Sequence, residues 1–170
     1  MKSIYRSEKS KSAVLELYDR QMESLKVPYK DLYMETSFGK THLIECGSIT
    51  GKPLLVFHGG NATTAYNLKD CSFLLKDFHI FAVDTIGHPG KSAEVSLSPG
   101  NESCKRLCRY QNPVLVMAAE KDCLFPAESV LPKARKVWKQ SICYLLKDRG
   151  HINELTDEEK QMIVDFLIEN

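Results

Sequence analysis

Polar residues directly follow four apolar segments of the sequence, and their types are those that acyl-transfer chemistry uses. Ligands of an open α/β sheet bind beyond the carboxyl ends of its strands, so residues that follow apolar segments are the first candidates for a site. Four such groups occur, namely His58-Gly59-Gly60-Asn61, Asp84 with the loop 87–92, Glu120-Lys121-Asp122 and Asp148-Arg149-Gly150-His151.

Asp122 and His151 are the pair with the clearest chemical meaning. They are 29 residues apart, which leaves room for one helix and one strand and places them at neighbouring strand ends. A carboxylate there can hold an imidazole in the tautomer whose other nitrogen takes a proton from a nucleophile. A single histidine in a loop is more often a surface residue, and a single aspartate after a strand more often forms a turn. The pairing predicts Asp122 as the acid and His151 as the base of a catalytic site.

The glycines after the apolar segment Pro53–Phe57 are candidates for an oxyanion site. Gly59 and Gly60 allow a sharp turn, after which the N–H groups of Gly60 or Asn61 can point at a substrate oxygen. The alternative is a tight turn without a chemical role. Because the turn directly follows a predicted strand, we predict oxyanion and substrate-binding roles for His58, Gly59, Gly60 and Asn61.

The elements that would position these residues alternate between strands and helices, which is typical of a parallel sheet. Apolar spacing predicts a helix over Ser12–Leu25, then a hairpin with the arms Asp31–Ser37 and Lys40–Cys46. Later strands are predicted at Pro53–Phe57, which should be buried on both faces, and at His79–Val83, Val114–Ala119 and Ile142–Leu146. Helices are predicted at Ala62–Lys76, Ser129–Trp138 and Thr156–Ile168, the last starting with a capping box of Thr156 and Glu159.

The chain of 170 residues has the size and composition of one globular domain. Its hydrophobic fraction is 43%, its charged fraction 26% and its net charge +1, so no long-range field favours nucleic acid or a membrane as partner. The six cysteines are spread over the chain and are expected to be reduced thiols. No apolar signal-peptide core and no run of about 18 apolar residues occurs. We expect a single cytoplasmic domain, 1–170, without a cofactor.

In combination, four ordered motifs resemble the α/β-hydrolase superfamily, in particular its small esterase and lipase-like members. LLVFHGGNATTAYN resembles the family's oxyanion strand and loop, and FHIFAVDTIGHPGKSAE resembles the next strand with its Asp-, Gly- and Ser-containing loop. PVLVMAAEKDCLFP and LLKDRGHINE resemble the acid and histidine segments. The resemblance covers about 31–93 and 110–170. It implies a reduced, mostly parallel sheet flanked by helices, with an N-terminal helix and hairpin, and a small-molecule acyl substrate.

The chain departs from this family between its two halves. Members place a strand, a G-x-S-x-G nucleophile elbow and further elements before the acid strand. Here only 30 residues separate Asp84 from Val114, and no G-x-S-x-G occurs. We expect a seam between Leu97 and Cys104, as though roughly a hundred residues had been lost, since a connection this short cannot hold those elements.

Three other groups are weighed as replacements for the missing serine. Ser92 matches a serine that is structural in the family. Cys104 and Cys108 lie near the seam, but neither sits in a glycine-flanked strand-to-helix turn. A metal site has no H-x-x-x-H or C-x-x-C spacing in its favour; its ligands would be His58, His88, Asp122 and His151. We identify no nucleophile and no metal site.

Two functions are consistent with this pattern. The first is an α/β-hydrolase-fold protein related to carboxylic-ester hydrolases, with activity lost or strongly reduced because no serine elbow is present. The second is a non-catalytic module on the same fold that binds a small ligand or regulates a partner. Loss of two central strands would leave apolar edges at Leu54–Phe57 and Val114–Ala119. We expect these two strands to pair directly, and a homodimer through the exposed edges is the alternative.

Overall fold

The computed structural model describes residues 3–60, 62–94 and 107–170, which belong to two compact units. Unit 1 is Met1–Pro99 and unit 2 is Gly100–Asn170. The predicted seam, Leu97–Cys104, contains this boundary and lies outside the described residues. The single domain expected from the sequence stays a prediction. No helix of the described residues has the length and apolar character needed to cross a membrane.

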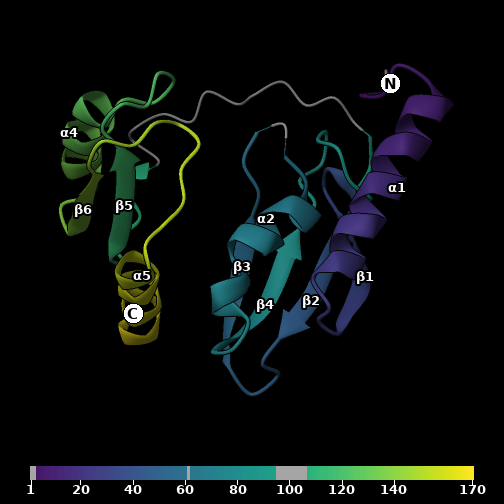
Figure 1. The fold of residues 1–170 in the computed structure, drawn as a ribbon, viewed down its shortest axis with the longest axis horizontal. Coiled ribbons are helices and arrows are strands. Elements are labelled where there is room, and N and C mark those ends of the chain that lie inside the picture. Colours follow the sequence, from purple (N-terminus) through teal and green to yellow (C-terminus); the bar gives the residue numbers. More distant parts are fainter. Residues whose placement is uncertain (1–2, 61, 95–106) are drawn as a thin grey trace. The chain divides into compact units, whose positions relative to one another are not determined.

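Unit 1 is a four-stranded sheet with two helices on one face (Figure 1). Its spatial order is β1 (Tyr29–Thr36), β2 (Gly39–Gly47), β4 (Phe78–Val83) and β3 (Lys52–Phe57). The pairs β1–β2 and β2–β4 are antiparallel, whereas β3 and β4 are parallel. The helices are α1 (Glu8–Ser24) and α2 (Thr64–Asp70), and the short 3-10 helix η1 (Ser72–Leu74) follows α2.

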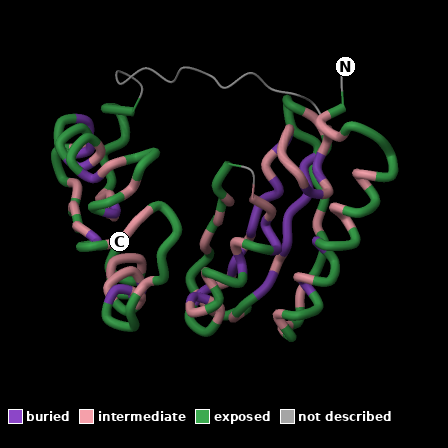
Figure 2. The backbone as a smooth tube through the Cα atoms, turned by 45° about the horizontal axis from the view of Figure 1, so that its top comes forward, coloured by how far each residue is buried: buried purple, intermediate pink, exposed green. Residues whose placement is uncertain are grey.

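The two faces of this sheet differ in their cover. On the helix-covered face, Ile44 lies opposite Ala82 and both are buried, and the buried stretches of Figure 2 run along β2 and β4. On the other face, Leu55 and Phe57 of β3 are 56% and 60% exposed. The expectation that Pro53–Phe57 is buried on both faces is therefore wrong. An apolar segment predicts two covering layers, and the described part of unit 1 supplies only one.

Unit 2 is a β-α-β unit followed by a helix. Its strands β5 (Val114–Ala119) and β6 (Ser141–Leu146) are parallel, and α4 (Ala127–Val137) connects them. Buried Ala118, Ala127 and Leu131 form a small core between strand and helix. The chain ends in α5 (Asp157–Glu169). These elements confirm the α/β class and the position of Asp122 and His151 after neighbouring parallel strands.

The expected direct pairing of β3 with β5 stays a prediction, because the two strands belong to different units. β3 is hydrogen-bonded to β4 in one sheet, and β5 is hydrogen-bonded to β6 in another. Each of the two strands therefore has one edge without a ladder partner among the described residues. Apolar side chains favour a buried strand, but they do not specify which strand is the neighbour.

The capping box at the start of α5 is confirmed. Thr156 Oγ1 accepts a hydrogen bond from the N–H of Glu159 at 3.3 Å, and Glu159 Oε2 accepts one from the N–H of Thr156 at 2.9 Å. Each side chain thus satisfies a backbone donor that the helix leaves free.

Replacing Thr156 with alanine is expected to lower the free energy of unfolding of unit 2 by about 1 kcal/mol, because one of these acceptors is lost. Trp138 is the only tryptophan of the chain and lies in unit 2, so its fluorescence during urea unfolding measures this loss. Thr156→Ser keeps the hydroxyl and is expected to unfold at the wild-type midpoint. A Thr156→Ala midpoint equal to that of the serine variant would contradict the capping role.

Candidate active site

Asp122 and His151 lie within hydrogen-bonding distance of each other in unit 2. Asp122 follows β5 and His151 follows β6, and the carboxyl ends of these parallel strands meet at one edge of their sheet. His151 Nδ1 is 3.0 Å from Asp122 Oδ2 and 3.2 Å from Oδ1. The spacing of 29 residues in the sequence therefore brings the two side chains together, as expected.

Backbone N–H groups hold the Asp122 carboxylate in place. Leu124 and Phe125 both donate to Oδ1, at 2.8 and 2.9 Å. The donor of Phe125 contributes most to a pKa of Asp122 that is lower than the ordinary value, and the hydrogen bond from His151 lowers it further. The side chain of Asp122 is 11% exposed and that of His151 is 43% exposed. The acid is a fixed, ionised acceptor, and the imidazole is the part that solvent or a substrate reaches.

The loop that carries His151 is tied to the two elements beside it. The N–H of Asp148, which has a φ of 56°, donates to Glu120 Oε2 at 2.8 Å. Arg149 Nη1 donates to Glu159 Oε2 at 2.6 Å and to the carbonyl of Glu154 at 3.0 Å. Burial raises the pKa of Glu159, but the hydrogen bonds from Arg149 and Thr156 and the charge of Arg149 together outweigh it, and the pKa is lowered. The end of β5 and the start of α5 together fix this loop.

The predicted oxyanion turn follows β3 in unit 1. His58 Nε2 accepts the N–H of Thr85 at 3.1 Å, and His58 Nδ1 lies 2.9 Å from the carbonyl oxygen of Gly59. The neutral tautomer protonated at Nδ1 satisfies both contacts. A Cβ atom at Gly59 or Gly60 would meet nothing within 4 Å. His58 thus links the residues that follow β3 and β4, and Asn61 lies outside the described residues.

The predicted site residues are divided between the two units. His58, Gly59 and Gly60 belong to unit 1, whereas Asp122 and His151 belong to unit 2. Within the described residues, no three His, Cys, Asp or Glu side chains are grouped so that they could hold a metal ion. Of the two cysteines near the seam, Cys108 is exposed and Cys104 lies outside the described part of the chain.

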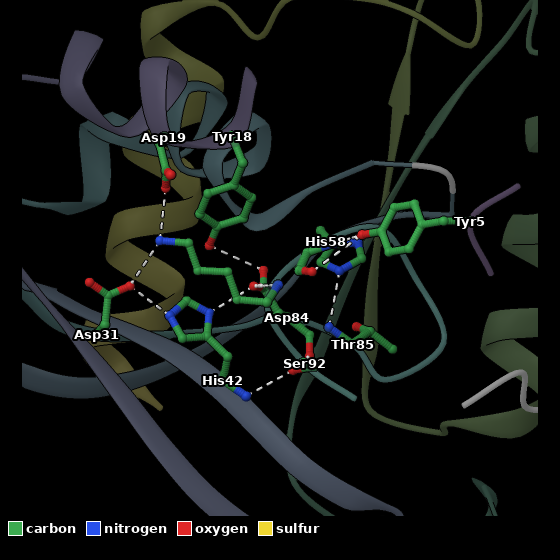
Figure 3. A network of polar contacts seen from close by, with 11 residues as sticks. Tyr5, Tyr18, Asp19, Asp31, His42, His58, Asp84, Thr85 and Ser92 are labelled. Atoms are coloured by element: carbon green, nitrogen blue, oxygen red, sulfur yellow. Dashed lines mark hydrogen bonds and ion pairs between the residues drawn. The ribbon is translucent and has the colours of Figure 1, made fainter. Parts of the chain in front are cut away.

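A buried network of charged side chains surrounds Asp84 in unit 1 (Figure 3). His42 Nδ1 is 2.7 Å from Asp84 Oδ2, and His42 Nε2 is 2.8 Å from Asp31 Oδ1. Tyr18 donates to Asp84 Oδ1 at 3.2 Å, and the N–H of Lys91 donates to Oδ2 at 2.8 Å. The side chains of His42 and Asp84 are fully buried. Both imidazole nitrogens face carboxylate oxygens, an arrangement that only the doubly protonated ring satisfies.

This network also explains Ser92. Its hydroxyl donates to the carbonyl of Asp84 at 2.6 Å and accepts the N–H of His42 at 2.8 Å, so its hydrogen bonds are used inside the core. Burial raises the pKa of Asp84, but the hydrogen bond from His42 and further donors outweigh it and lower the pKa. The sequence singled out Asp84 and Ser92 and missed His42. The available signal was a histidine on the same face of β2 as the apolar residues Ile44 and Cys46.

Two curated carboxylesterases of Bacillus subtilis (strain 168) match part of the chain, and no family model matches it. Carboxylesterase YbfK is 32% identical over 75 residues, which are 44% of this chain and 25% of that protein. The uncharacterized carboxylesterase nap is 33% identical over 84 residues, 48% of this chain and 27% of that protein. The chain thus matches about a quarter of the length of each of these relatives.

A similar solved structure is the crystal structure of carboxylesterase CesB (YbfK) from Bacillus subtilis. It has a TM-score of 0.80 and 15% sequence identity, and the alignment covers 95% of this chain and 99% of that chain. Because 75 residues are 25% of YbfK, that protein has about 300 residues. A chain of 170 residues can span 99% of it only if on the order of 130 of its residues have no counterpart in the alignment.

Proposed function

Since the chain has a reduced α/β-hydrolase fold and is related to carboxylic-ester hydrolases, we propose that it keeps their acid–histidine pair but has lost the serine nucleophile. The contact between His151 Nδ1 and Asp122 is the observation that supports this most strongly. The difference in length from YbfK supports it too, because this chain is shorter and has no G-x-S-x-G elbow.

In this proposal each residue keeps its inherited role. Asp122 orients His151, whose Nε2 would take the proton of an attacking hydroxyl. The backbone N–H groups of Gly60 and Asn61 would stabilise the oxyanion of the intermediate. Without the serine, the first covalent step lacks its attacking hydroxyl, and removal of a triad nucleophile lowers turnover on the order of a million-fold. The substrates would be small carboxylic esters, hydrolysed slowly or not at all.

Labelling with a fluorophosphonate, which reacts with activated serines, tests this proposal. We expect no labelled serine in the purified chain, and hydrolysis of p-nitrophenyl acetate on the order of a million-fold slower than by YbfK, which serves as the positive control. A labelled serine together with turnover in the range of the control would overturn the proposal, because both require an intact nucleophile.

An apolar groove in unit 1 favours a second candidate, a non-catalytic module that binds a small apolar ligand. The groove has a volume of about 440 Å³, within the range of ligand pockets. Its apolar lining residues are Met34, Phe38, Leu43, Leu55, Phe57, Val83 and Ile86. Fluorescence of an environment-sensitive apolar dye should rise with the wild-type chain and not with Leu55→Lys. A dimer that forms without dye binding would instead favour association through the free edges of β3 and β5.

A further inference from the structure

The nitrogen of His151 that faces away from Asp122 is available for chemistry. Nδ1 lies close to both carboxylate oxygens of Asp122, so the ring proton is on Nδ1 and the lone pair is on Nε2. Among the described residues, no side chain or backbone group forms a hydrogen bond with Nε2. The imidazole is 43% exposed, so an ester can approach this lone pair from solvent.

The carboxylate behind the ring makes this imidazole a stronger electron donor. Asp122 accepts the Nδ1 proton and would balance the positive charge of a ring substituted at Nε2. Its position does not depend on His151 alone, because the N–H groups of Leu124 and Phe125 hold Oδ1 at 2.8 and 2.9 Å. The pKa of Asp122 is lowered mainly by the Phe125 donor, so the carboxylate stays ionised in neutral solution.

Exposed apolar side chains lie in the two loops that carry Asp122 and His151. Phe125 is 63% exposed, and its ring centre lies 6.0 Å from that of His151. Leu124 and Ile152, the chain neighbours of Phe125 and His151, are 62% and 90% exposed. Burial of these side chains against an apolar acyl or aryl group lowers the free energy of binding, whereas a charged substrate does not bury their apolar surface favourably. The class of ligand that fits beside Nε2 is therefore an apolar ester.

We infer that His151 Nε2 itself attacks activated apolar carboxylic esters, so that the acyl group of the ester is transferred to this histidine. The inference rests on the proposed loss of the serine. The Nε2 lone pair bonds to the acyl carbon while the ester C–O bond breaks and the aryloxide leaves with the electron pair. Water then adds to the acyl carbon and the C–N bond breaks. The electron pair returns to Nε2, and the acid leaves and gives its proton to solvent.

Rapid mixing of the chain with p-nitrophenyl acetate, followed by native mass spectrometry at neutral pH and fragmentation of the intact chain, tests this inference. We expect a burst of p-nitrophenolate and one acetyl group on the fragment that contains His151. His151→Ala is expected to abolish both, and Asp122→Asn to slow the burst because the ring loses its charged partner. His79→Ala is the matched control, since His79 also contacts a carboxylate, Glu45 at 2.8 Å, and should react like wild type.

The same variants separate this inference from the proposed function. A burst that survives in His151→Ala, or an acetyl group found on another residue, overturns the inference. If a fluorophosphonate then labels a serine, the proposed function falls as well, whereas it stands if no serine is labelled. Circular dichroism of His151→Ala should match wild type, because the replaced side chain is exposed.

Discussion

Asp84→Ala is expected to lower the free energy of unfolding of unit 1 by about 3–5 kcal/mol, the usual cost of removing one partner of a buried ion pair. The alanine variant leaves the buried His42 imidazole without the carboxylate that lies 2.7 Å from Nδ1. Tyr18 and the N–H of Lys91 lose their acceptor in the same change. A buried donor without an acceptor itself lowers the free energy of unfolding, so the contacts of His42, Tyr18 and Lys91 all contribute to the expected loss.

Hydrogen exchange of the β2 and β4 amides measures this loss, because both strands contribute to the buried network. Asp19→Ala is the matched control. Asp19 pairs with Lys91 at 2.8 Å in the same network, but its side chain is 52% exposed, so its removal should cost less than about 1 kcal/mol. Equal losses for the two aspartates would show that burial of the Asp84 pair has no energetic importance.

The pH dependence of Asp84→Asn gives a second readout. In the folded chain the pKa of Asp84 lies below its ordinary value of 3.8, so the ionised carboxylate stabilises the fold above that pH. This contribution is lost as the pH falls through the folded pKa. Wild type and Asp84→Asn should therefore differ most above about pH 4 and converge in stronger acid. A difference that stays constant from neutral to strongly acidic solution would contradict the assignment.

Gly47→Ala is expected to destabilise unit 1 by about 2–6 kcal/mol, the sum of a strained backbone and an overpacked contact. Gly47 has a φ of +82°, and a Cβ atom there would clash with the carbonyl oxygen of Phe78. Since that oxygen belongs to the backbone of β4, no side-chain rotation relieves the clash. Gly47 ends β2 where that strand pairs with β4, so the alanine variant disturbs the centre of the sheet.

Thermal unfolding followed by far-ultraviolet circular dichroism measures this effect, with Gly60→Ala as the control. A Cβ atom at Gly60 meets nothing within 4 Å, and a substitution in open space changes stability by less than about 0.5 kcal/mol. The Gly47→Ala transition should therefore lie well below that of Gly60→Ala. Coincident transitions would mean that the contact with Phe78 relaxes at little cost.

The sequence predicted those parts of the fold that depend on neighbouring residues. The bounds of β5 match the predicted Val114–Ala119, and the capping box of Thr156 and Glu159 is present, because strand periodicity and helix caps are local patterns. The contact between Asp122 and His151 followed from their spacing, since one crossover helix joins two parallel strands. These predictions needed no knowledge of the rest of the chain.

The features of the fold and of the site that the sequence did not predict depend on pairing between segments far apart in the sequence. His42 and Asp84 lie on or directly after β2 and β4, which pair antiparallel although β3 and α2 intervene. Local periodicity does not reveal such a neighbour, so the buried ion pair had no signal beyond one histidine among apolar residues. The exposure of Leu55 and Phe57 was missed for a related reason, because apolar composition does not tell whether a covering element is present.

Backbone pairing in the described chain is closed within each unit, since β1 to β4 pair among themselves and β5 pairs with β6. A break in the chain between Pro99 and Gly100 therefore cuts no ladder hydrogen bond of either sheet. A recombination event at this position in the gene would leave each half encoding all the described strands of its own sheet.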